Sequence, residues 1–264
     1  MKQFILNKEP GRDNIVRLEG SDYHYLVKVR RLAVGESFPA LLPCGTETLV
    51  KILTINHNNL TGKCKTLSET GNRGCPLPPI ILFQAMPKSD KMDLIVRQAA
   101  EGEITEIVPF ISEYSVAKTS AKGEKFLRWE RIIKEARQQS GSKTATSIRE
   151  PFKLNELFEY WKTLKTDGLA ANLPALGLLF HHQSLEQESL HGYLDSVPQV
   201  IVLAIGPEGG FSDTEVSLFL ENGFKPFTIG DTILRTETAA LYCAAAIRIL
   251  LLERNSWVLK QKKI

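Results

Sequence analysis

The 264-residue sequence has almost no excess of one charge and no long hydrophobic run. Its 33 Lys and Arg nearly balance its 30 Asp and Glu, so the net charge of +3 does not by itself indicate a nucleic-acid partner. The longest apolar tract, residues 239–252, is interrupted by Arg248 and is too short to cross a bilayer. The opening MKQFILNKEPGRDN reaches charges and Pro10 after a very short apolar run. We therefore expect no signal peptide and no membrane partner.

Cysteine is also scarce, and its pattern argues against two kinds of site. The four cysteines are scattered, with no C-x-x-C pair and no histidine at metal-ligand spacing: Cys44, Cys64, Cys75 and Cys243. This argues against a zinc site and against a disulfide framework. We expect reduced thiols, no metal and a cytoplasmic location.

The first 70 residues or so read as short β segments separated by turns. Strand-like runs cover residues 36–43, 46–56 and 59–67, with turn signals at 44–45 and 57–59. Closely spaced short strands predict a small β-barrel. Residues 21–36 (SDYHYLVKVRRLAVGE) are interpreted as a helix with a strongly basic end.

A Gly/Pro-rich break at residues 68–79 (SETGNRGCPLPP) predicts a domain boundary, giving domains 1–72 and 73–264. Beyond it, strands and helices alternate. Strands are expected at 80–86 and 104–112 and within 168–180, and helices at 91–103 and 125–139. This alternation predicts an α/β domain with a mainly parallel sheet.

Two further strand-like runs near the C-terminus each end in a glycine-bearing loop that opens into a helix. They are VIVLAIGPEGGFSDTEV (200–216) and FTIGDTILRTETAALYCAAAIRIL (227–250). Glycines after a buried strand let a ligand approach the backbone, which suits a nucleoside-like cofactor. Ser212 and Glu215 form a capping box, and Thr236 is a candidate N-cap of the last helix. A capped turn without a ligand explains the first loop equally well.

The charges in the second loop favour a ligand site, although a structural ion pair is the alternative. Arg235 and Glu237 fall where an apolar sheet end meets a helix start. No G-x-G-x-x-G follows a strand and no G-x-x-x-x-G-K-[ST] is present, which disfavours a dinucleotide fold and a phosphate-binding P-loop.

These two loops, IGPEGGFSDTEV and IGDTILRTETAA, resemble the cofactor-loop motifs of SPOUT-class RNA methyltransferases. More narrowly, they resemble the RsmE family, which methylates N3 of a uridine in 16S ribosomal RNA. The resemblance extends to PKSDKMDLIVRQAAEGEITEIVPFISEYS, to WERIIKEARQQSG and to HYLVKVRRLAVGE near the N-terminus. It implies an N-terminal PUA-like β-barrel for RNA, a C-terminal α/β domain with a trefoil knot, and a homodimer.

The resemblance also implies S-adenosyl-L-methionine as the cofactor and assigns residues to its pocket. Carried over by position, these are Leu203, Ile205, Gly206, Gly210, Ile229, Gly230, Ile233, Leu234 and Thr236. Uridine N3 carries a proton and is a poor nucleophile until that proton leaves. A base that accepts the proton, or a cation near the negative charge that develops on the uracil oxygen, therefore helps the reaction. Arg235 is the candidate cation, and Glu237 or Glu208 is the candidate for orienting the substrate or accepting the proton.

A basic surface for ribosomal RNA is predicted from two segments. In FLRWERIIKEARQQ the apolar residues share one helix face, while Arg128 and Arg131 lie on another. With Lys28, Arg30 and Arg31 near the N-terminus, they form a candidate phosphate-binding track to 16S rRNA or the assembling small ribosomal subunit. A solvated helix face is the alternative.

The sequence departs from the family pattern at three places in the half expected to face RNA. Gly102 and Glu103 stand where Leu-Gly is common, Tyr114 stands in place of an arginine, and Gln138 and Ser142 replace a glutamate and an arginine. Two alternatives therefore stay open: a knotted methyltransferase for another rRNA or tRNA base, and a non-catalytic RNA-binding assembly factor. His181 and His182, at the end of the strand before the first loop, are interpreted as structural, with a catalytic base as the alternative.

Overall fold

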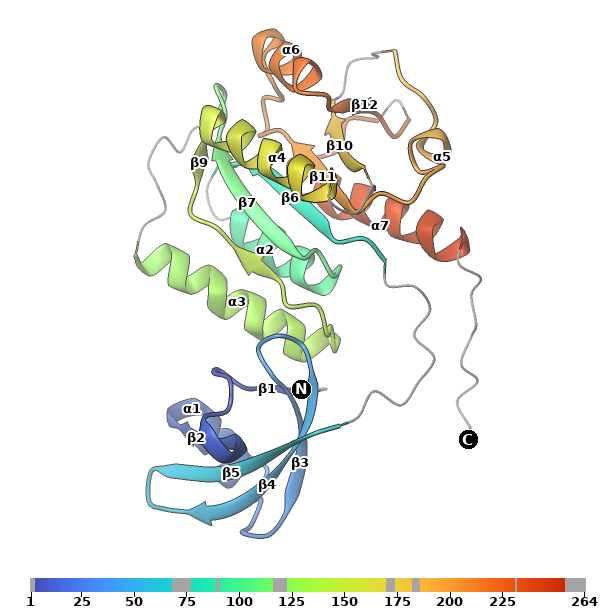
Figure 1. Cartoon of the computed structure of the whole chain (residues 1–264). Helices are drawn as coiled ribbons and strands as arrows, with labels where there is room; N and C mark the ends of the chain where they lie inside the picture. The colour runs from blue at the N-terminus through green and yellow to red at the C-terminus, as the bar shows by residue number, and fades with distance from the viewer. Residues whose placement is uncertain are drawn as a thin grey trace. The chain divides into compact units, whose positions relative to one another are not determined.

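A computed structural model describes residues 3–67, 77–88, 91–115, 123–169, 174–181, 186–230 and 232–254. The chain folds into two compact units, Met1–Asn72 with Arg137–Ala145, and Arg73–Ala136 with Thr146–Ile264 (Figure 1). The break predicted at residues 68–79 falls mostly outside the described residues. No helix in the described ranges is long and apolar enough to cross a membrane.

The first unit is built on a five-stranded curled sheet. Its strands are β1 (Phe4–Ile5), β2 (Ile15–Glu19), β3 (Ser37–Leu41), β4 (Glu47–Ile55) and β5 (Asn59–Thr66), in the order β1-β3-β4-β5-β2. The β1–β3 pair is parallel and the others are antiparallel. Alternating residues such as Val50, Ile52 and Leu60 point into one apolar core. β1 and β2 form the two edges of this sheet, so among the described residues the expected small barrel takes the form of a curled half-barrel.

The helix expected over residues 21–36 is shorter than predicted. A single turn, α1 (Gly20–Tyr23), continues as a π-helix, His24–Val29, and a 3-10 turn at Arg12–Asn14 precedes β2. The backbone then turns sharply, since Arg31 has a left-handed φ of 57°. Such a conformation is uncommon for a side chain larger than glycine, and π-helical turns often mark functional positions.

Residues 137–145 complete the first unit, although they are distant from it in sequence. The side-chain amide of Gln3 donates to the carbonyls of Arg137 (3.3 Å) and Ser142 (3.0 Å), and Lys143 pairs with Glu47 (2.7 Å). Gly45 permits this contact, because a Cβ there would lie 2.1 Å from the Lys143 carbonyl oxygen.

This packing shows where two of the departures from the family pattern lie. Gln138 and Ser142 are both buried. Arg137 is buried as well, and burial lowers the pKa of its guanidinium. These side chains therefore pack inside the protein.

The second unit contains a parallel sheet with the order β12-β10-β11-β6-β7-β8, and β9 also pairs with β7. The strands are β6 (Ile80–Ala85), β7 (Glu106–Ile111), β8 (Ser147–Ile148), β9 (Phe152–Lys153), β10 (Ala175–Phe180), β11 (Val200–Ile205) and β12 (Lys225–Phe227). β6 and β11 are buried along their whole length, as their continuous apolar sequences predict. The parallel α/β sheet expected from the sequence is confirmed.

Helices cover both faces of this sheet (Figure 1). α2 (Lys91–Glu101), α3 (Glu124–Ser140) and α7 (Thr236–Arg254) pack on one core cluster, and α4 (Leu154–Leu169) and α6 (Asp213–Glu221) on the other. A one-turn helix, α5 (Leu190–Tyr193), lies against the first cluster. α4 was not predicted, although Leu157, Trp161 and Leu164 have helical spacing.

The predicted capping box at the start of α6 is confirmed. Ser212 accepts a hydrogen bond from the Glu215 N–H (3.3 Å), and the Glu215 carboxylate accepts one from the Ser212 N–H (3.1 Å). The same buried carboxylate accepts bonds from the Ser112 hydroxyl (3.1 Å) and the Glu113 N–H (2.9 Å). Glu215 therefore fastens the turn after β7 to the start of α6.

One departure from the family pattern, Glu103 in place of a common glycine, lies at a left-handed backbone position with a φ of 60°. This conformation costs a residue with a side chain roughly 1–2 kcal/mol, which accounts for the glycine that is common there. Here the Glu103 carboxylate forms an ion pair with Arg248 of α7. Gly102 lets α7 approach closely, since a Cβ there would lie 3.3 Å from a methyl of Leu241.

We therefore expect Glu103→Gly and Glu103→Gln to differ in stability. Both variants lose the partly buried ion pair, which contributes about 1 kcal/mol, but only the glycine variant relieves the left-handed backbone. Glu103→Gly should be the more stable of the two by roughly 1 kcal/mol in the free energy of unfolding by urea. Equal stability would show that the backbone at this position is unstrained.

Candidate functional site

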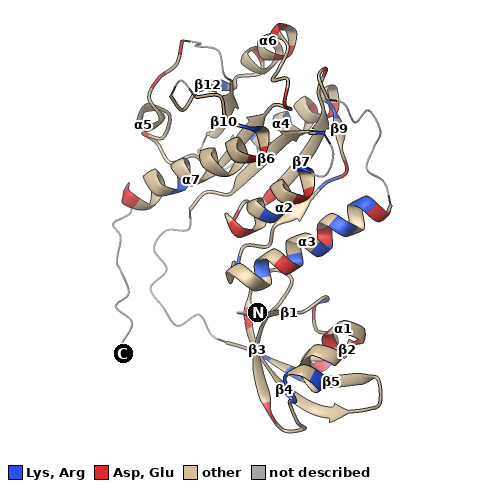
Figure 2. Cartoon of the chain, turned by 180° about the vertical axis from the view of Figure 1, so that it is seen from behind, with Lys and Arg blue, Asp and Glu red and all other residues tan. Residues whose placement is uncertain are grey.

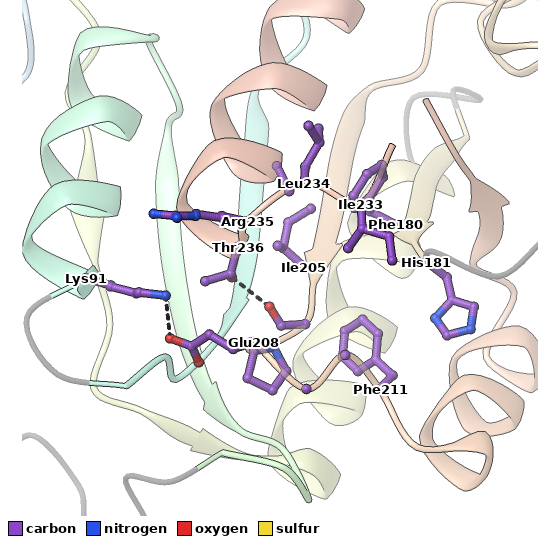
Figure 3. Close-up of a pocket in the computed structure, with 15 residues that line it drawn as sticks. Lys91, Phe180, His181, Ile205, Glu208, Phe211, Ile233, Leu234, Arg235 and Thr236 are labelled. Atoms are coloured by element: carbon purple, nitrogen blue, oxygen red, sulfur yellow. Dashed lines mark hydrogen bonds and ion pairs between the residues drawn. The ribbon is translucent and has the colours of Figure 1, made fainter. Parts of the chain in front are cut away.

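A pocket of about 360 Å³ opens where β10 and β11 end and α7 begins (Figure 3). The last residues of the two strands, Phe180 and Ile205, are register partners, so their ends meet at one edge of the sheet. Ligands commonly bind at the carboxyl edge of parallel strands. The pocket is lined by Lys91, Phe180, His181, Ile205, Gly206, Pro207, Glu208, Gly209, Gly210, Phe211, Ile233, Leu234, Arg235, Thr236 and Ala239.

The loop after β11 folds back on itself at two of its glycines. Gly210 has a left-handed φ of 71°, and its N–H donates to the Pro207 carbonyl (2.9 Å). A Cβ on Gly206 would lie 3.2 Å from the Gly210 carbonyl carbon. The loop therefore closes tightly and leaves its backbone beside the cavity.

A hydrogen-bonded relay connects this loop to the sheet and to α7. The Thr236 hydroxyl donates to the Gly206 carbonyl (2.7 Å) and accepts from the side-chain amide of Gln84 in β6 (2.9 Å). Gln84 and Thr236 are buried, so each bond replaces contacts that water would otherwise supply. The expectation that Thr236 caps the last helix was wrong: α7 begins at Thr236 itself, and its hydroxyl holds the other loop.

A charged cluster lies on the side of the pocket nearer α2, where Lys91 points toward Glu208 (Figure 3). Lys91 Nζ lies 2.9 Å from Glu208 Oε1 and 3.6 Å from Glu237 Oε2. Glu208 also accepts hydrogen bonds from the Lys88 N–H, at 3.1 and 3.2 Å to its two oxygens. One ammonium group thus bridges two of the predicted catalytic residues.

These contacts set the charge state of Glu208. Partial burial alone would raise the pKa of this carboxyl, but the hydrogen bonds from Lys91 and the backbone outweigh burial and lower it. Pairing with Glu208 in turn raises the pKa of Lys91. At neutral pH the cluster therefore contains an ionised pair.

Six of the nine residues expected to bind the cofactor line the pocket: Ile205, Gly206, Gly210, Ile233, Leu234 and Thr236. Leu203, Ile229 and Gly230 are not among the lining residues. Leu203 is a buried core residue of β11 itself, and Ile229 packs against the same cluster. Ile233 is 76% exposed, so this wall of the pocket presents an apolar side chain to solvent.

Of the three expected catalytic residues, Arg235 and Glu208 line the pocket, whereas Glu237 joins the cluster through Lys91. The Arg235 side chain is exposed and has no ion-pair partner among the described residues. The alternative of a structural Arg235–Glu237 ion pair therefore does not hold. His181 lines the pocket and is buried, while His182 falls outside the described residues.

Two members of the site were missed by the sequence analysis, namely Lys91 and Gln84. Both lie more than 100 positions before the loops that they contact. Gln84 carries a weak signal, as a polar residue in the otherwise apolar strand IILFQA. A buried polar side chain in such a strand needs a partner, which here is Thr236.

The residues expected to bind RNA divide between the two units. Lys28, Arg30 and Arg31 are all exposed in the first unit, and none has an ion-pair partner among the described residues. In the second unit, Arg128 pairs with Asp93, and Arg131 lies 3.9 Å from Glu135. Figure 2 shows charges of both signs along α3.

Comparisons with known proteins agree on one family. A family described as RNA methyltransferase domain matches residues 74–248. The Synechocystis protein named ribosomal RNA small subunit methyltransferase E is 33% identical over 241 residues, which cover 89% of this chain and 73% of that protein.

Two solved structures resemble the whole chain. Ribosomal RNA small subunit methyltransferase E from Neisseria gonorrhoeae, bound to S-adenosyl methionine, has a TM-score of 0.74 at 24% identity. A putative methyltransferase from Legionella pneumophila, in complex with the same cofactor, has a TM-score of 0.73 at 26% identity. Each of these two matches covers 95% of this chain and 98% of the chain in the solved structure. The fold class expected from the resemblance is confirmed.

We predict that Lys91→Met raises the pKa of Glu208 toward its ordinary value, because burial then acts without the ammonium group. Since the pairing lowers the pKa, the ion pair is complete at neutral pH and is lost as the pH falls through the folded-state pKa of Glu208. A carbon-13 NMR titration of the glutamate carboxyls, assigned with Glu208→Gln, measures the shift. Lys91→Arg is the matched control and should keep the pKa low. An unchanged titration in Lys91→Met would contradict the bridge.

Proposed function

Because the chain belongs to the RNA methyltransferase family, and within it to the ribosomal RNA small subunit methyltransferase E family, we propose that it methylates N3 of a uridine in 16S rRNA. The methyl donor in this proposal is S-adenosyl-L-methionine. The observation that carries it is the pocket built by the two strand-end loops, Gly206–Phe211 and Ile233–Thr236.

The residues of this pocket fit such a cofactor. Its volume of about 360 Å³ lies in the range usual for small-molecule sites. Ile233, Leu234 and Phe180 offer apolar walls suited to a nucleoside base, and Gly206 and Gly210 leave backbone groups accessible for polar contacts. The Legionella protein, at 26% identity, was solved in complex with the same cofactor, which supports this assignment.

When bound, S-adenosylmethionine would supply a methyl group on a positively charged sulfur. A nucleophilic nitrogen that bonds to this methyl carbon breaks the carbon–sulfur bond, and the sulfur leaves as a neutral thioether without the help of a metal. Uridine N3 becomes such a nucleophile when its proton leaves and negative charge spreads to the uracil oxygens. Arg235 is the side chain that we assign to stabilise this charge, because it lines the pocket and has no partner among the described residues.

Glu208 and Glu237 receive an orienting role in this proposal. Both contact Lys91, and Glu208 already accepts hydrogen bonds from the backbone of Lys88. A carboxylate with a lowered pKa is a weak proton acceptor, so Glu208 is better suited to fixing the shape and charge of the pocket.

We assign RNA binding to the first unit and to α3. Arg30 and Arg31 are exposed cations next to a π-helical turn, which suits contacts with phosphate groups. Arg128 and Arg131 each have an acidic neighbour, so they should contribute less to RNA affinity than the cations of the first unit.

We also propose that the protein acts as a homodimer. α7 carries an exposed stripe of mostly apolar residues at helical spacing: Thr238, Tyr242, Ala245 and Ile249. Tyr242 and Ile249 are each 51% exposed. A second copy would remove this surface from water, and α7 begins at the pocket, so the interface would adjoin the site.

Mass spectrometry of nucleosides tests the proposed function. The purified protein is incubated with S-adenosylmethionine and unmethylated 16S rRNA, free or in small subunits, and the digested RNA is analysed. We expect N3-methyluridine. A different methylated nucleoside would favour a methyltransferase for another base, and no methylated nucleoside would favour a non-catalytic assembly factor.

In the same assay, Arg235→Ala should lower turnover by about 100- to 1,000-fold, the loss typical of removing one group that stabilises developing charge. Cofactor binding, measured by calorimetry, should remain. Arg235→Lys keeps the positive charge, so its turnover should fall less than that of Arg235→Ala. Near-normal turnover of Arg235→Ala would refute its role.

A further inference from the structure

Tyr114 is an exposed aromatic residue in the turn that follows β7. Its side chain is 49% exposed, and its hydroxyl has no hydrogen-bond partner among the described residues. A tyrosine that neither fills the core nor satisfies a buried polar group has no evident structural task. This residue also stands where the family pattern has an arginine.

The backbone that carries Tyr114 is held by hydrogen bonds on both sides. The Ser115 N–H donates to the Ser112 carbonyl (3.0 Å), and the Ser112 N–H donates to the Ser115 hydroxyl oxygen (3.2 Å). The Glu113 N–H donates to Glu215 at the start of α6 (2.9 Å). An aromatic ring on a fixed backbone loses little conformational freedom when a ligand stacks on it.

Tyr114 is not itself a lining residue of the pocket, but it packs against Gly209, which is. A Cβ built on Gly209 would lie 3.2 Å from the Tyr114 Cβ and 3.5 Å from its ring atoms Cγ and Cδ2. Tyr114 therefore lies against the loop residue, and Gly209 itself lines the pocket. The missing side chain at position 209 is what makes room for the tyrosine.

The charge around Tyr114 favours one kind of ligand. The exposed Glu113 precedes it, so a phosphate group at this rim would meet a carboxylate, while the Glu208 carboxylate next to Gly209 is already paired with Lys91. The neutral face of a nucleobase would not be repelled. A base that enters a pocket for modification must leave its stack, and it is commonly held by an aromatic side chain.

From this geometry we infer that Tyr114 stacks on a nucleobase of the RNA at the rim of the pocket and so helps to select the RNA substrate. The inference rests on the proposed function and deepens it. The adenine of the cofactor is the other nucleobase that could reach this rim, and the experiment must separate the two.

The test compares Tyr114→Ala, which removes the ring, with Tyr114→Phe, which keeps it. Methyl transfer is measured as a function of RNA concentration at saturating cofactor, and cofactor affinity is measured by calorimetry. We expect Tyr114→Ala to raise the KM for RNA by about 5- to 100-fold, the range for losing one stacked base. Tyr114→Phe should stay within about 2-fold of the unchanged protein, and neither variant should alter cofactor affinity.

A second measurement separates this inference from the proposed function. Fluorescence anisotropy of a labelled single-stranded 16S rRNA fragment reports RNA binding without turnover. If the unchanged protein binds this RNA but does not methylate it, the proposed function fails, and weaker binding by Tyr114→Ala than by Tyr114→Phe still supports stacking.

Three outcomes overturn the inference. In the first, Tyr114→Ala weakens cofactor binding and leaves RNA binding and the KM for RNA unchanged, which would show that the ring contacts the cofactor. In the second, Tyr114→Ala changes neither the affinity for the cofactor nor the binding and KM of the RNA. In the third, the unchanged protein does not bind the RNA fragment. Because Tyr114 is half exposed, both variants should keep the thermal stability of the unchanged protein, which a melting curve checks.

Discussion

The site depends on one buried hydrogen bond, from the Thr236 hydroxyl to the Gly206 carbonyl (2.7 Å). It joins the end of β11 to the first residue of α7, two segments that otherwise belong to different strand–helix connections. Gln84 donates to the same hydroxyl from β6, so three elements converge on one oxygen atom. Without this bond, the two loops that form the pocket would be linked by apolar packing and by the partly exposed Lys91 bridge, and neither fixes distance as sharply as a buried directional bond does.

Two other groups extend this organisation to the outer parts of the second unit. Lys91 at the start of α2 contacts two carboxylates, Glu208 of the first loop and Glu237 in the first turn of α7. Glu215 at the start of α6 holds the turn after β7, which carries Tyr114. Side chains at three helix starts therefore fix the loops around the pocket. Helix starts suit this task because their backbone N–H groups and side chains are free to bond outside the helix.

Much of the fold follows from local rules of the sequence. Alternating apolar residues predicted β3, β4 and β5, continuous apolar runs predicted β6 and β11, and the pair Ser212 and Glu215 predicted the start of α6. Local rules did not predict the left-handed backbone conformation at Arg31 and Glu103. They also missed α4, whose apolar spacing was available in the sequence.

The site was less predictable than the fold, for a physical reason. The two loops were found because their glycines and charges are unusual after apolar strands. Their partners were not found, because Gln84 and Thr236 are 152 positions apart and meet only when the sheet order is known. The role of Thr236 was misjudged for the same reason: a cap is a local interaction, whereas its actual bond to Gly206 spans 30 positions.

The central claim is that the Thr236 hydroxyl holds the two loops in the shape that binds the cofactor. Calorimetry of S-adenosylmethionine binding to Thr236→Val and Thr236→Ser tests it most directly. Valine keeps the shape but leaves the Gln84 amide and the Gly206 carbonyl unpaired, so affinity should fall by about 10-fold or more, whereas serine should retain it. Wild-type affinity in a folded Thr236→Val protein would contradict the claim.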